Sequence, residues 1–165
     1  MFELKPLSKE AVPKALEKAE RYRLLNEPGE AESICQDVLR IDPENQEALI
    51  TLLLAVTDEL DHGVADAVAR AREVLSRLRG DYERAYYAGI ICERRAKGQV
   101  RQGGPGSGYA AYHTLREAME WYEKAESLRP PGNDDARLRW NTCVRILERH
   151  PDLRPAPDER EQPLE

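Results

Sequence analysis

The sequence predicts an all-α protein, from its composition, the spacing of its apolar residues and an internal repeat. Ala, Leu, Glu and Arg dominate, 34% of the residues are charged and only 6% are aromatic, a mixture that favours helices over strands. Helical spacing is clearest at Leu49, Leu52, Leu53 and Val56, which stand at i, i+3, i+4 and i+7 and form one apolar stripe.

The internal repeat combines small and bulky residues in the same order at two places in the chain. Residues 116–130 (REAMEWYEKAESLRP) carry two alanines with bulky Trp121 and Tyr122 between them, and end in a proline. Residues 29–45 (GEAESICQDVLRIDPEN) repeat the arrangement near the start. Each copy of such a repeat is a helical hairpin that buries its apolar face only against its neighbours.

This pattern resembles the tetratricopeptide repeat, an antiparallel pair of helices of roughly 34 residues. The resemblance covers about residues 12–147 and implies a superhelix of three helix pairs closed by a C-terminal capping helix. The expected repeats span about 12–45, 46–81 and 82–132, the capping helix spans 133–149, and residues 1–150 form a single domain.

Turn residues separate the paired helices of the first two repeats. The segment 26–29 (NEPG) breaks the first pair, and Pro43 ends its second helix because proline disfavours helical geometry in the residue before it. In the second pair, the turn at 61–63 (DHG) is longer than in the family, and the second helix is expected to end near Gly80.

Two features distinguish the third repeat. Gly89 stands where the family favours a small residue, which predicts a close helix crossing that offsets the roughly 1 kcal/mol cost of glycine in a helix. Residues 99–115 are an insertion relative to the family. Because its glycines cluster in the GGPGSG segment, we expect two lengthened helices, roughly 82–102 and 108–128, joined by a tight turn. The alternative is a long flexible loop.

The C-terminal part divides into a helix and a tail. Asn133 is a suitable N-cap for the last helix, and Ala136 and Cys143 lie on an apolar stripe that is expected to cover the open end of the stack. Residues 151–165 are rich in proline and charge and have little to bury, which predicts a disordered tail.

Charge and cysteine content restrict the partners and the compartment. The net charge of −6 and the pI near 5.3 argue against nucleic acid or an anionic membrane as the main partner. The longest nearly apolar run, 48–56, is too short to cross a bilayer, and no targeting segment is recognisable. Cys35, Cys92 and Cys143 fall at core positions of the repeats, so we expect buried thiols and a cytoplasmic location.

Motifs for chemistry are not found in the sequence. His62, His113 and His150 lack the spacing of a metal site, so no metal is expected. The GGPGSG segment resembles a phosphate loop only superficially, because it lacks the GK[ST] ending and follows no strand. We therefore predict no cofactor, no catalytic residue and no enzymatic activity.

The resemblance implies a binding groove on the concave face, which the first helix of each repeat lines. Its positions carry over to Leu16, Glu20, Ile50, Leu54, Tyr86, Ile90, Arg94, Arg137, Asn141 and Arg145, with Arg23, Leu24, Glu47, Thr57, Asp58, Glu83, Glu93 and Val144 completing the face. An apolar stripe with a charged rim suits a peptide or helix of a partner protein. Some family members hold a chaperone's C-terminal carboxylate through Lys and Asn at positions that are here Leu16, Glu20 and Ile50. These side chains cannot bind a carboxylate, so that class of partner is not expected.

Two other functions stay open at this point. One is a small-ligand-sensing or accessory subunit of an enzyme complex, which uses the same cavity for a compact molecule. The other is self-association through the lengthened hairpin, which makes a homo-oligomer. Tyr109, Tyr112 and Leu115 fall close to one helical face there and form the predicted second contact surface.

Overall fold

The computed structural model describes residues 1–62 and 66–157, and within them the protein contains helices and no strand. The all-α prediction is therefore confirmed. The α-helices of this part of the chain are α1 (Val12–Leu24), α2 (Pro28–Ile41), α3 (Gln46–Asp58), α4 (Ala67–Ser76), α5 (Asp81–Gln102), α6 (Ser107–Leu128) and α7 (Asp135–Arg149). Single 3-10 turns, η1 (Lys9–Ala11) and η2 (Glu59–His62), precede α1 and follow α3.

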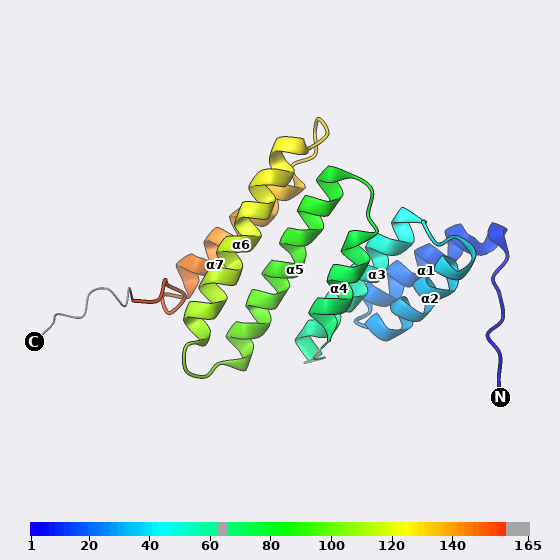
Figure 1. The fold of residues 1–165 in the computed structure, drawn as a ribbon, viewed down its shortest axis with the longest axis horizontal. Coiled ribbons are helices and arrows are strands. Elements are labelled where there is room, and N and C mark those ends of the chain that lie inside the picture. Colours follow the sequence, from blue (N-terminus) through cyan, green and yellow to red (C-terminus); the bar gives the residue numbers. More distant parts are fainter. Residues whose placement is uncertain (63–65, 158–165) are drawn as a thin grey trace, which may run out of the picture.

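Consecutive helices pack against each other along the whole stack. Each of α1 to α6 contacts the helix that follows it, and α1 also contacts α3, which in turn contacts α5. Figure 1 shows the result as a row of helices along the long axis, with α1 and α2 near one end and α6 and α7 near the other. Leu54 and Tyr87 contact both the N-terminal and the C-terminal core clusters, so the core is continuous through α3 and α5.

Local signals place the helix ends near the predicted boundaries. The side chain of Asn45 accepts a hydrogen bond from the backbone N–H of Ala48 at 2.9 Å, which caps the start of α3. Pro28 occupies the first turn of α2, where its missing N–H costs nothing, and that helix ends at Ile41, before Pro43. Of the predicted 61–63 turn, the first two residues belong to η2, and Gly63 lies outside the described residues.

The insertion forms two long helices, as expected. α5 and α6 have 22 residues each, and the long-loop alternative is wrong. Gly103, Gly104 and Gly106 in the connecting turn have φ values of 64°, 95° and 77°. Glycine adopts this left-handed region without the steric penalty of a Cβ, which explains why the turn is rich in glycine.

The beginning of the tail folds back on this hairpin. Leu153 is only 6% exposed, and a Cβ at Gly108 would stand 2.6 Å from the backbone oxygen of Asp152. The predicted disorder is therefore wrong at Asp152 and Leu153, because an apolar side chain and a close glycine contact hold them against α6. Residues 158–165 of the predicted tail lie outside the described residues.

Among the described residues, none of the helices has the length and apolarity that a bilayer crossing demands.

The close crossing predicted at Gly89 is confirmed. A Cβ built there would stand 2.5 Å from a ring carbon of Tyr122 on α6, and Tyr122 is 1% exposed. Because the ring is buried in a packed interior, an added Cβ would force it to shift, and glycine permits this close approach of the two long helices.

A matched pair of glycine substitutions tests the crossing. Gly89→Ala is expected to lower the free energy of unfolding by about 1–3 kcal/mol, because the buried Tyr122 ring must shift. Gly98→Ala lies in the same helix with no neighbouring atom within 4 Å, so it is expected to raise stability by roughly 0.5–1 kcal/mol. Urea unfolding followed by circular dichroism measures both. Stabilisation by both substitutions would contradict the crossing.

The three cysteines are core thiols, as expected. Cys35 and Cys143 are fully buried and Cys92 is 5% exposed. Burial raises the pKa of Cys35 and of Cys143 to about 12, and that of Cys92 to about 11. A thiol with such a pKa is almost entirely protonated at neutral pH, and the thiolate is the reactive form.

A thiol-reactive chromophore at pH 8 is therefore expected to label the native protein slowly and all three thiols rapidly in denaturant. Mass spectrometry of the digested protein identifies which residue reacts. Fast native labelling of any one of them would contradict its burial.

Candidate functional site

The predicted groove residues lie on α1, α3, α5 and α7, but the structure leaves only part of them accessible. Glu20, Asn141 and Arg145 are exposed, and Ile50, Leu54 and Tyr86 are half-buried. Of the remaining positions, Leu24 and Glu47 are exposed, Glu83 and Val144 are half-buried, and Thr57 is buried.

Leu16 and Ile90 are wrongly assigned to the groove surface. Leu16 is 4% exposed and belongs to a core cluster with Val38 and Ala48, and Ile90 is 6% exposed in the cluster that α5, α6 and α7 build. The family resemblance predicted both as groove residues, but their side chains pack into the interior. The accessible apolar stripe is therefore shorter than predicted.

Two tyrosines that the sequence reasoning missed enlarge the stripe. Tyr82 stacks on Tyr86 with ring centroids 5.8 Å apart, and Tyr87 meets Tyr86 edge-on at 5.0 Å. All three rings are half-buried, as are Ile50 and Leu54 on α3. The i, i+4 spacing of Tyr82 and Tyr86 was a usable signal for this pair. We call Ile50, Leu54, Tyr82, Tyr86 and Tyr87 the inner patch.

Hydrogen bonding and burial hold the inner patch in place. The side-chain amide of Asn133, in the loop before α7, donates to the Tyr82 hydroxyl at 3.1 Å. Burial raises the pKa of Tyr82, Tyr86 and Tyr87, so all three are neutral at physiological pH. The patch offers aromatic faces and neutral hydroxyl groups, a combination that is common in the cores of protein interfaces.

Three of the predicted groove charges pair with each other. The Asp58 carboxylate on α3 accepts a hydrogen bond from Nε of Arg23 on α1 at 2.9 Å, and forms a second ion pair with Arg94 on α5. All three side chains are less than a third exposed. Arg94 is therefore committed within the protein and is not available to an acidic partner, which corrects the expectation from the sequence.

Arg137 also has a partner within the chain. Its Nε donates to Glu126 on α6 at 2.5 Å, so Arg137 links α7 to α6. It is therefore not part of the face that carries the inner patch, which we call the inner face. Arg145 keeps its predicted place as an exposed cation on α7, and no ion pair is found for it in residues 1–62 and 66–157.

Glu93 is the most deeply buried charged side chain described, with 0% exposure, although its repeat position predicted a groove residue. Its carboxylate accepts hydrogen bonds from Nε of Arg139 on α7 at 3.1 Å and from Nζ of Lys97 at 3.0 Å. Tyr122 donates to it at 3.4 Å, and the Cys143 thiol lies 3.6 Å away. Only the Glu93–Lys97 pair, at i and i+4, was readable from the sequence.

The electrostatics of Glu93 follow from these partners. Burial by itself would raise the pKa of the carboxyl, but the hydrogen bond from Arg139 and the charges of Lys97 and Arg139 outweigh burial, and the pKa is lowered. Glu93 is therefore ionised and fully paired. This network attaches α7 to the α5–α6 hairpin.

The predicted second contact surface is only partly accessible. Tyr109 and Tyr112 are half-buried, and the ring of Tyr112 meets His113 edge-on at 5.5 Å. Leu115 is 1% exposed and belongs to the core, because α7 and the segment around Leu153 cover this side of the hairpin. Leu115 is therefore wrongly assigned to a contact surface.

In the part of the chain that the structure describes, no three His, Cys, Asp or Glu residues gather closely enough to hold a metal ion. Comparison with known proteins adds no relative to this geometry: no family model, no curated protein and no solved structure matches the chain.

Replacement of Glu93 by glutamine tests the buried network. Glu93→Gln removes the charge but keeps the shape, and it is expected to lower the free energy of unfolding by about 1–3 kcal/mol at pH 7. The folded-state pKa is lowered, so the ionised carboxylate stabilises the protein above its ordinary pKa of 4.5, and this contribution is lost as the pH falls through the folded-state value.

The difference in the free energy of unfolding between the parent and Glu93→Gln is therefore expected to be largest at pH 6–7 and to decrease below about pH 4.5. Denaturant unfolding at a series of pH values measures it. A difference that stays constant down to pH 3 would contradict the ion pairing.

Proposed function

We propose that the protein is a non-catalytic interaction module of the tetratricopeptide type, which binds a peptide or helix of a partner protein on its inner face. The observation that carries the proposal is the inner patch, in which three tyrosines of α5 contact one another and, with Ile50 and Leu54 of α3, remain half-buried at the edge of the core clusters. The succession of packed helices supports the repeat architecture, and the three predicted core thiols support the register.

The chemistry of the inner patch suits a partner side chain that is itself apolar. Tyrosine contributes a large, rigid and amphipathic surface at a small cost in conformational entropy, which is why tyrosines are frequent among residues that dominate binding energy. Ile50 and Leu54 offer the aliphatic surface beside them. A helix or extended segment with one or two apolar anchors fits such a surface.

The remaining free charges define the ends of the binding face. Glu20 and Glu47 are exposed on α1 and α3, whereas Arg145 is exposed on α7. Because Arg23 and Arg94 both pair with Asp58, they do not neutralise the exposed Glu20 and Glu47, and the α1–α3 end of the face is acidic. We therefore expect a partner segment with basic residues at that end, and an acidic residue only near α7.

Small-ligand sensing, self-association through the hairpin and the cytoplasmic location stay predictions from the sequence. Exclusion of nucleic acid as a partner rests on the net charge alone.

Substitutions in the inner patch test the proposal. Ile50→Asp and Tyr86→Ala are expected to weaken capture of a partner from the source cell's lysate by about tenfold or more, since anchors in interface centres carry at least ~1–2 kcal/mol each. Arg40→Glu, on the exposed side of α2, is the matched control and is expected to change nothing.

Quantitative mass spectrometry of the captured proteins reads out the loss, and circular dichroism verifies that each variant is folded. Retention of the same partner by both inner-patch variants would move the binding site away from this face.

A further inference from the structure

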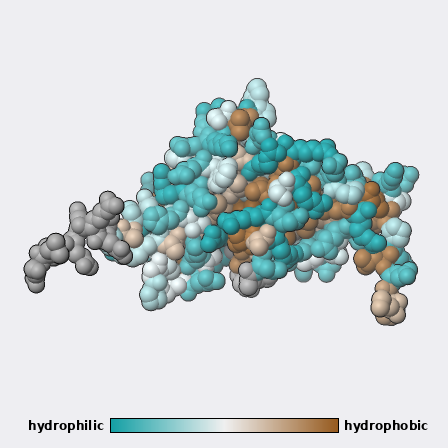
Figure 2. Space-filling view, viewed as in Figure 1, coloured by the Kyte–Doolittle hydropathy of each residue, from teal (hydrophilic) through white to brown (hydrophobic). Residues whose placement is uncertain are grey.

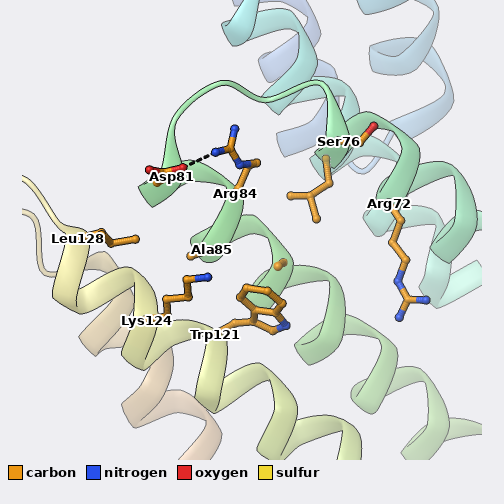
Figure 3. A pocket seen from close by; sticks show the side chains of 10 residues that line it. Arg72, Ser76, Asp81, Arg84, Ala85, Trp121, Lys124 and Leu128 are labelled. Atoms are coloured by element: carbon orange, nitrogen blue, oxygen red, sulfur yellow. Dashed lines mark hydrogen bonds and ion pairs between the residues drawn. The ribbon is translucent and has the colours of Figure 1, made fainter.

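A second concave surface lies on the other side of α5. It is a hollow of about 530 Å³ between α4, α5 and α6 (Figure 3). The residues of α5 that line it are Asp81, Arg84, Ala85 and Ala88. With 3.6 residues per turn, these positions lie on the face of α5 that points away from Tyr86, the central ring of the inner patch. We call this surface the outer hollow.

The floor and walls of the outer hollow are apolar. The buried Ala85 and Ala88 form a floor of small side chains, and Leu75 from α4 and Trp121 and Leu128 from α6 supply the larger apolar side chains of the lining. Trp121 is half-buried and Leu128 is 43% exposed. Figure 2 shows apolar residues gathered over the middle of this side of the molecule, where Figure 1 places α4 and α5.

The rim of the outer hollow is cationic in a chain whose net charge is −6. Arg72 comes from α4, Arg84 from α5 and Lys124 from α6, whereas Asp81 is the single carboxylate of the lining. Arg84 pairs with Asp81 and also donates to the backbone oxygens of Leu78 and Arg79. The net excess of charge in the lining is therefore positive.

Arg72 and Lys124 remain available for an anion. Neither forms an ion pair in residues 1–62 and 66–157. The Lys124 ammonium stands 5.3 Å from the ring centroid of Trp121, a cation–π contact that keeps the charge beside the apolar wall. In Figure 3, Trp121 and Lys124 rise from α6 toward α5, and Arg72 extends from α4 on the other side.

We propose that the outer hollow binds an acidic peptide segment of a partner protein through one apolar or aromatic anchor residue. The anchor contacts Trp121, Leu75 and the alanine floor, and carboxylates on either side of it pair with Lys124 and Arg72. The volume falls within the roughly 300–1,000 Å³ typical of ligand pockets. A flat anionic membrane cannot reach the recessed floor, whereas a single side chain can. This site is separate from the inner face and goes beyond the function proposed for it.

The test uses Trp121 as its own reporter. The chain has two tryptophans, so Trp140→Phe leaves Trp121 as the single indole. A synthetic peptide, in which one phenylalanine is flanked on each side by two glutamates, is titrated into this protein. We expect the fluorescence emission of Trp121 to change and to saturate as the peptide binds. The affinity for the peptide is expected to fall as the salt concentration is raised. Two control peptides, one with alanine for the phenylalanine and one with lysines for the glutamates, are expected to bind at least tenfold more weakly.

Charge reversal then locates the peptide. Lys124→Glu and Arg72→Glu in the same background are each expected to weaken binding at least fivefold, whereas Arg40→Glu and Tyr86→Ala are expected to leave it unchanged. Both reversed side chains are exposed, so circular dichroism is expected to show parental helix content.

Absence of binding by the glutamate peptide, or equal binding by the lysine peptide, would overturn the proposal. Loss of binding in Tyr86→Ala with retention in Lys124→Glu would also overturn it, and would place the peptide on the inner face instead. Displacement of the peptide by anionic phospholipid vesicles would assign the surface to a membrane and overturn it as well.

Discussion

The close contact between Gly89 and the Tyr122 ring positions most of the surfaces that this protein presents. The ring of Tyr122 packs where Gly89 lacks a side chain, and the hydroxyl of the same residue reaches the buried carboxylate of Glu93. Glu93 in turn binds Arg139 and so attaches α7. One buried tyrosine thus connects the two long helices and the last helix, and it sets the depth and rotation of α5.

The rotation of α5 decides what each side of the molecule offers. Tyr82, Tyr86 and Tyr87 emerge on one side, and Ala85 and Ala88 form the floor of the hollow on the other. Both surfaces contain apolar groups beside free charge, but of opposite sign: the α1–α3 end of the inner face is acidic, and the rim of the outer hollow is basic. The proposed sites therefore select partner segments of opposite charge, although both depend on the same helix.

Internal ion pairs account for the small number of free charges near either surface. Asp58 pairs with Arg23 of α1 and with Arg94 of α5. Glu93 pairs with Arg139 and Lys97, and Asp81 pairs with Arg84. Such pairs contribute modestly to stability when partly exposed, and they restrict which side chains can meet a partner. The charges left over, such as Glu20, Arg72 and Lys124, are those from which specificity is expected.

The sequence predicted the helices and the hairpin, because helical spacing and a cluster of glycines each report on a local constraint. The core cysteines and the glycine crossing were predicted from the positions of these residues in the repeat that the sequence resembles. The sequence did not predict how deep a side chain lies. Leu16, Ile90 and Glu93 fall on the predicted face of their helices, but their burial depends on how far neighbouring helices close over them. The pairing of Asp58 with Arg23 and Arg94 and the return of Leu153 onto the hairpin likewise join residues that are distant in sequence. No periodic pattern encodes those contacts.

Native-state hydrogen exchange tests the organising role of the α5–α6 crossing most directly. The amides of residues 88–96 and 118–125 surround Gly89, Glu93 and Tyr122 and are expected to exchange only through global unfolding. Their apparent opening free energies should equal the free energy of unfolding from denaturant titration and exceed those of α1 and α2. Exchange of these amides through local openings, at a lower free energy than those of α1 and α2, would contradict the account.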